Sequence, residues 1–140
     1  MKRCQICTAL SFLFLACVAF AVDTNFGQSF STATVVSFSP ANGATGVNVA
    51  TTTKLTVTFS EPMDQHGYSF VIISGRTFPP TAGTAVWRNS KTIELPVALA
   101  PGKTYTLGLN GGSHMNFKDV LGRPLNPVVW SFTTRRGALL

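Results

Sequence analysis

Three side chains that could bind a metal ion lie in one short segment of the chain. Glu61, Asp64 and His66 fall within a run of six residues. Carboxylates and imidazole are common metal ligands, but a metal site also needs a ligand set of suitable number and geometry, and this spacing matches no recognised set. We therefore predict an ordinary loop here.

Asp119 is the candidate calcium ligand, because it begins an Asp-x-x-Gly sequence that ends at Gly122. Calcium takes about six to eight oxygen ligands, and only Asn116 and backbone carbonyls lie near Asp119 in sequence. The same residues suit a turn in which the carboxylate accepts backbone hydrogen bonds and the glycine completes the turn. We favour the turn.

The sequence offers no set of residues for nucleophilic or glycosidic catalysis. A nucleophilic serine or cysteine needs a histidine that an acid orients, and no serine stands in a Gly-x-Ser-x-Gly sequence. The five acidic residues do not suggest the paired carboxylates of a glycosidase. We predict a protein that is not an enzyme, with no catalytic, cofactor-binding or metal-binding residues and no cofactor.

The first 21 residues have the features of a secretion signal. Lys2 and Arg3 precede an apolar run, and Ala19-Phe20-Ala21 supplies the small residues of a cleavage site. The apolar run is shorter than the roughly 20 residues that span a bilayer core. We predict cleavage after Ala21 and a product without a membrane span that is secreted, periplasmic or part of the cell envelope.

Cys17 raises an alternative for the attachment of the chain. Leu15-Ala16-Cys17 is similar to the end of a lipoprotein signal, although Phe14 stands where such signals prefer leucine. A lipid anchor at Cys17 is therefore the less favoured reading of this segment.

The composition of the remaining chain limits how it can be stabilised and what it can bind. All three cysteines precede residue 18, so no disulfide can stabilise the exported part, and an apolar core must do so. Loss of Lys2 and Arg3 leaves nine basic and five acidic residues, a net charge of +4. Because only Arg135 and Arg136 are adjacent basic residues, we predict no nucleic-acid partner.

Strand alternation organises the rest of the sequence. Residues 54–59 place Leu55, Val57 and Phe59 on one face, with polar residues between them. The same pattern predicts strands over 34–38, 68–73, 84–88, 92–95, 104–109 and 128–134, with a turn-rich connection over 40–46. The inward residues predicted on these strands are Phe38, Phe70, Ile72, Trp87, Ile93, Leu95, Tyr105, Leu107, Leu109, Trp130 and Phe132. Seven short strands predict an all-β sandwich.

A Pro-Gly turn at Pro101 and Gly102 leads to Tyr105 at the start of a predicted strand. This arrangement is typical of a tyrosine corner, in which the phenol hydroxyl bonds back to the preceding connection and fixes the crossover between two sheets.

Five motifs in order carry a resemblance to a known family. They are Pro40 to Val47, Leu55 to Met63, Pro101 to Tyr105, Asp119 to Gly122 and Trp130 to Thr134. Together they resemble the bacterial Ig-like domain of the SbsA type, over residues 35–134. The resemblance implies an immunoglobulin-like β-sandwich of about seven antiparallel strands, used as a non-catalytic spacer, surface-layer or adhesion module, with other surface or secreted proteins or cell-envelope components as partners. We expect a signal peptide over 1–21, a linker over 22–33, the sandwich over 34–134 and a tail over 135–140.

A small copper-carrying or carbohydrate-binding protein remains the alternative function. Met63, His66, His114 and Met115 offer the sulfur and imidazole ligands that copper prefers, and periplasmic copper carriers of the CopC type share a strand ending in Phe-Ser-Glu-Pro. Those carriers use an N-terminal histidine, however, whereas cleavage after Ala21 leaves Val22.

Overall fold

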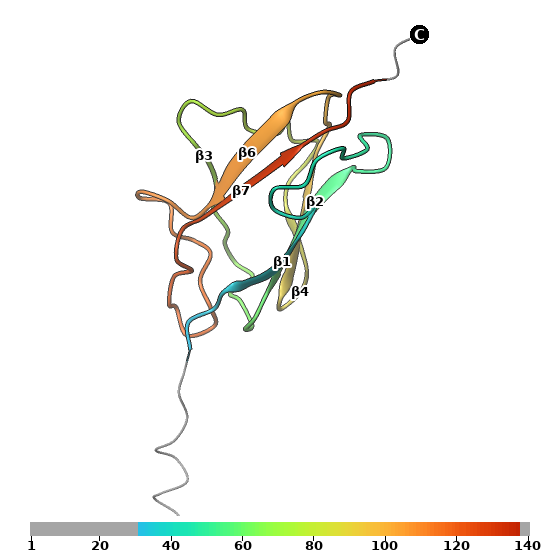
Figure 1. Ribbon diagram of the computed structural model, residues 1–140. Helices are drawn as coiled ribbons and strands as arrows, with labels where there is room; N and C mark the ends of the chain where they lie inside the picture. Colours follow the sequence, from blue (N-terminus) through green and yellow to red (C-terminus); the bar gives the residue numbers. More distant parts are fainter. Residues whose placement is uncertain (1–30, 138–140) are drawn as a thin grey trace, which may run out of the picture. The chain divides into compact units, whose positions relative to one another are not determined.

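The computed structural model describes residues 31–137, which form seven β-strands and no helix (Figure 1). The part described therefore has no helix long and apolar enough to cross a membrane. Predictions for residues 1–30 and 138–140 lie outside the described residues. They include the signal peptide, the Cys17 anchor, most of the linker and the last three residues of the tail.

The strands form two antiparallel sheets. The first has the order β1-β2-β5-β4 and the second the order β3-β6-β7. The strands are β1 (Val35–Ser39), β2 (Lys54–Phe59), β3 (Phe70–Ile72), β4 (Val86–Asn89), β5 (Thr92–Pro96), β6 (Thr104–Leu109) and β7 (Val128–Thr133). In immunoglobulin terms these are sheets ABED and CFG, so the all-β, immunoglobulin-like sandwich is confirmed.

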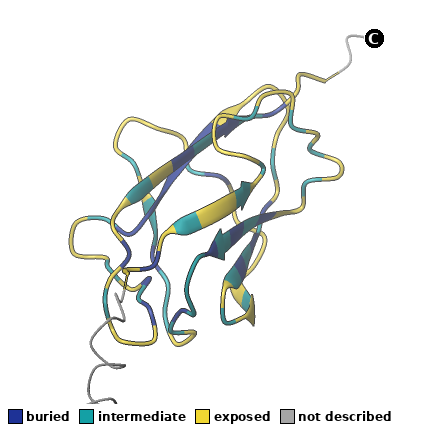
Figure 2. Cartoon of the chain, turned by 60° about the horizontal axis from the view of Figure 1, so that its bottom comes forward, coloured by how far each residue is buried: buried dark blue, intermediate teal, exposed yellow. Residues whose placement is uncertain are grey.

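The buried residues, dark blue in Figure 2, come from strands of both sheets and form one hydrophobic core. On β2 the predicted alternation is confirmed, because Leu55 and Val57 are fully buried and Phe59 is 1% exposed. The predicted inward residues of β5, β6 and β7 are also buried. Phe38, Phe70 and Trp87 are partly buried and pack against this core.

The prediction that Ile72 points into the core is wrong, since this side chain is 74% exposed. Ile72 pairs with Leu107 and lies on the same face of β3 as Phe70, as alternation requires. However, β3 is an edge strand of its sheet and ends at Ile72, and among the described residues no strand flanks it on its outer side, so the side chain stays exposed. The strand is also shorter than the predicted 68–73.

The long connection between β6 and β7 contributes to the core as well. Phe117 and Leu125 are buried in it, although neither lies on a strand. Buried Asn110 holds them, because its amide Nδ2 donates to the carbonyl oxygens of Phe117 and Leu125 and its Oδ1 accepts from Phe117 N–H, each at 2.9 Å. Phe117 then packs edge-on against Phe70, with ring centroids 5.1 Å apart.

Candidate functional site

The loop over 61–66 is a hydrogen-bonded turn. Asp64 Oδ1 accepts from His66 N–H at 2.9 Å and lies 2.7 Å from His66 Nδ1. The backbone N–H of His66, and then its ring, hold the pKa of Asp64 below its ordinary value. Among residues 31–137 no group of three or more His, Cys, Asp and Glu side chains could hold a metal ion.

The four residues considered for copper lie in different surroundings. Met63 belongs to the hydrophobic core and is 1% exposed, whereas the His66 side chain is 97% exposed. His114 is exposed and lies in a turn whose ends are joined by the backbone bonds between Gly111 and His114. A buried thioether and a solvated imidazole do not make one ligand set, so copper is not supported by this geometry.

Asp119 forms the predicted turn. Its Oδ1 accepts from Leu121 N–H at 2.9 Å and Arg123 N–H at 3.0 Å, and its Oδ2 accepts from Arg123 Nε at 2.7 Å. Gly122 has the expected positive φ of 80°. The Asp119 side chain is 2% exposed. Val120 and Leu121 form the tip of this turn, and each is 63% exposed.

Burial and hydrogen bonding act in opposite directions on the ionisation of Asp119. Burial favours the neutral carboxyl group and is the largest single influence. Hydrogen bonds from the Arg123 backbone, the Arg123 side chain and the Leu121 backbone together outweigh burial, and they hold the pKa of Asp119 below its ordinary value. The carboxylate is thus charged and fully used in holding the turn.

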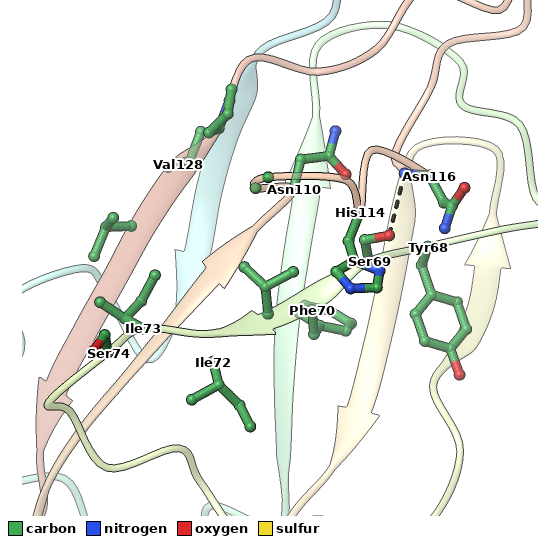
Figure 3. Close-up of a pocket in the computed structure, with 15 residues that line it drawn as sticks. Tyr68, Ser69, Phe70, Ile72, Ile73, Ser74, Asn110, His114, Asn116 and Val128 are labelled. Carbon is green, nitrogen blue, oxygen red and sulfur yellow. Dashed lines mark hydrogen bonds between the residues drawn. The ribbon is translucent and has the colours of Figure 1, made fainter.

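An open groove of about 810 Å³ lies beside β3 (Figure 3). Its lining includes Val71 and Ile73, the turn that carries His114, and the start of β7. A Cβ on Gly108 would lie 2.7 Å from Val71 Cγ2, so Val71 packs directly on the glycine of the central strand. None of the fifteen lining residues is Lys, Arg, Asp or Glu.

The predicted tyrosine corner is confirmed. Buried Tyr105 accepts a hydrogen bond at its hydroxyl oxygen from Ala100 N–H at 3.0 Å. The carbonyl of Ala100 accepts from Thr134 Oγ1 at 2.7 Å, and Thr134 Oγ1 accepts from Lys103 N–H at 2.9 Å. The connection from the first sheet to the second is therefore held both by Tyr105 of β6 and by Thr134, which directly follows β7.

A second group of hydrogen bonds joins residues 42–47, which we call the clamp segment, to β7 and its continuation. The backbone bonds are Gly43 N–H to Ser131 O at 2.6 Å, Thr133 N–H to Ala44 O at 2.8 Å, Val47 N–H to Thr133 O at 3.1 Å and Arg135 N–H to Val47 O at 2.8 Å. The bridge between Val47 and Thr134 is parallel.

Side chains reinforce the clamp segment. Asn42 Nδ2 donates to Val129 O at 3.1 Å, and Asn42 Oδ1 accepts from Ser131 N–H at 2.9 Å. Trp130 Nε1 donates to Pro40 O at 3.0 Å, just before the segment. Figure 1 shows β1 beginning at one end of the sandwich and the chain after β7 leaving at the other.

Sequence reasoning did not single out Asn42, Asn110 or Thr134. Asn110 has a φ of 57°, and its position before Gly111-Gly112 at the end of a strand is a usable signal, because asparagine tolerates that region better than most residues. Asn42 lies beside a glycine in a turn, but nothing in the sequence indicates its bonds to a strand near the other end of the chain.

The sequence was compared with protein families and with curated proteins. The family described as "Bacterial Ig-like domain" matches residues 30–134. No curated protein matches the chain.

Proposed function

This chain belongs to the bacterial Ig-like domain family, and on that premise we propose that it is a load-bearing module of an exported bacterial protein. Membership suggests a non-catalytic, surface-associated module. The proposal adds a specific role, which is to transmit tension between its two ends as a spacer. Its partners would be other surface or secreted proteins, or components of the cell envelope.

The observation that carries the proposal is the parallel pairing of the clamp segment with β7. The chain enters before β1 and leaves after β7 at the opposite end, so tension pulls the two paired segments past each other. Hydrogen bonds that are sheared in this way must break together, whereas those of a hairpin pulled open from its free end break in turn. Each bond contributes only about 1 kcal/mol at equilibrium, but simultaneous loss raises the barrier to forced unfolding.

Asn42 permits a direct test of this role. Asn42→Ala removes two side-chain bonds to β7, and Asn42 is exposed, so the core is unchanged. Asn48→Ala is the matched control, because the side chain of exposed Asn48 bonds only within its own turn, where its Oδ1 accepts from Ala50 N–H. We expect Asn42→Ala to lower the unfolding force in single-molecule pulling between residues 31 and 137, and Asn48→Ala to leave that force near the parent value.

The direction of pulling provides the decisive comparison. Residues 22–140 contain no cysteine, so handles can be attached at introduced cysteines. Pulling between residues 75 and 137 does not shear the clamp segment past β7 in the same way, and there Asn42→Ala should have little effect. An Asn42→Ala variant as strong as the parent between residues 31 and 137 would contradict the load-bearing role.

Export needs its own measurement. We expect the full chain, expressed in a bacterium, to be recovered outside the cytoplasm with Val22 as its first residue by mass spectrometry. A product that begins with an acylated Cys17 would show a lipid anchor instead. A product that keeps Met1 and stays in the cytoplasm would contradict export.

A further inference from the structure

The two sheets have four edge strands, and the clamp segment already covers one of them, β7. Of the other three, β1 and β4 pair irregularly with their neighbours. The pairing of β1 with β2 shifts register between Val35 and Ser37, and that of β4 with β5 shifts between Trp87 and Asn89. Such bulges, like charged side chains, protect edges from pairing. In contrast, β3 pairs with β6 without any shift, and residues 68–74 contain no charge and no proline.

The backbone of β3 has polar groups available at its outer edge. Asn110 N–H donates to Ser69 O, which makes residues 69 and 110 a hydrogen-bonded pair of the β3–β6 ladder. Antiparallel ladders alternate, so Val71 also bonds toward β6, while the N–H and C=O groups of Phe70 and Ile72 point away from it. Among the described residues, no strand lies on that side of β3.

Charge restricts where a second copy of this chain could pair. The nine basic and five acidic residues that follow residue 21 make two copies repel each other over most of their surface. The groove beside β3 has no Lys, Arg, Asp or Glu in its lining. The edge is also self-complementary, because an antiparallel strand presents the same donors and acceptors after a two-fold rotation.

We propose that two copies of this protein pair through β3, antiparallel, about a two-fold axis beside Val71. Phe70 of each copy then lies opposite Ile72 of the other, and these two pairs exchange about four backbone hydrogen bonds. Ile72, which is 74% exposed in one copy, is covered by the second copy's Phe70. The result is one continuous sheet with the order β7-β6-β3-β3-β6-β7.

The small size of the edge sets the strength of the association. A strand of three residues buries much less than the roughly 1,600 Å² of a standard interface, so we expect a dissociation constant on the order of 0.1 to 1 mM. Such pairing matters where many copies are held close together. It is independent of the load-bearing role, because β3 takes no part in the bonds of the clamp segment.

The test is sedimentation equilibrium of the exported protein from about 10 μM to about 2 mM, together with amide NMR shifts over the same range. We expect the average mass to rise toward that of a dimer, with the largest shifts at Phe70 and Ile72. Ile72→Lys should abolish the rise, whereas the control Val36→Lys, on the β1 edge at 65% exposure, should not. Ile72→Pro, which removes the outward N–H together with the isoleucine side chain, should also abolish it.

Four results would overturn the proposal. A protein that stays monomeric throughout the range does not pair, and a dimer that survives Ile72→Lys pairs elsewhere. Equal weakening by Val36→Lys would show a general effect of added charge. If Ile72→Pro fails to fold, as judged by circular dichroism, the Ile72→Lys variant and the NMR shifts still decide between these outcomes. If the NMR shifts of β3 change only when a Thr-Val repeat peptide is added, then this edge binds a peptide and the self-pairing proposal is wrong.

Discussion

Removal of one oxygen atom from Tyr105 should measurably destabilise the sandwich. Tyr105→Phe keeps the ring, which packs against Phe132 with centroids 5.8 Å apart, and removes only the acceptor of Ala100 N–H. A hydrogen bond contributes about 1 kcal/mol net, and a donor left without a partner adds more when water cannot reach it. Ala100 is exposed, so water can replace part of the loss.

We therefore expect a loss of about 1 to 2 kcal/mol in the free energy of unfolding. For a domain of this size, that loss lowers the melting temperature by about 4 to 12 °C. The assay is urea denaturation followed by tryptophan fluorescence, with circular dichroism to confirm that the all-β structure is kept. The slope of free energy against urea should not change, because the substitution alters stability and not the surface exposed on unfolding.

Tyr68→Phe is the matched control for this experiment. Tyr68 is the only other tyrosine, and its hydroxyl makes no hydrogen bond with a residue of the described chain. Its loss should change stability by less than about 0.5 kcal/mol. The reasoning is refuted if Tyr105→Phe is as stable as the parent, or if the two variants are destabilised equally.

Three further variants test other parts of the structure. Phe59→Ala should cost about 3 to 5 kcal/mol in urea denaturation, because Phe59 is 1% exposed, and a loss below about 1 kcal/mol would mean that its burial is wrong. Asp119→Asn should cost about 1 to 3 kcal/mol at pH 7. Because the folded-state pKa of Asp119 is lowered, the ionised carboxylate makes the parent more stable than the variant above the unfolded-state pKa of about 3.9. This extra stability is lost as pH falls through the folded-state pKa. The free energies of unfolding of the two proteins should therefore converge in acid. A constant difference from pH 7 to pH 2 would contradict this. The double variant His66→Ala/His114→Ala should keep the parent's melting temperature, since both histidines are exposed, and a loss of fold or of a measured binding activity would disprove that expectation.

The parts of the fold that could be predicted from sequence are those in which one local rule decides the outcome. On β2, strict alternation and a neighbouring strand on both sides make the apolar face the buried face. The Pro-Gly turn before Tyr105 likewise fixes where the phenol can reach. The Asp119 turn needs only residues within four positions of the carboxylate.

The prediction failed where burial depends on segments distant in sequence. Alternation gives the face on which Ile72 lies, but it does not show that the sheet ends there. Phe117 and Leu125 enter the core from a connection in which side chains follow no period, so pattern analysis could not find them. The connection over 40–46 was predicted to be rich in turns, yet its bonds to β7 depend on how the two sheets close, and no local motif contains that information.

In the Asp119 turn, the groups that fix the backbone are different from the side chains that are exposed at the tip. The bonds that fix the turn come from the Asp119 carboxylate, backbone N–H groups and Arg123, so the side chains of Val120 and Leu121 are not needed for it. Because these two residues are also largely exposed, they can be exchanged with little effect on stability. Random libraries at the two positions should therefore yield folded proteins at high frequency. Substitutions at this tip could give the domain new binding specificity, by evolution or by design, without changing the rest of the fold.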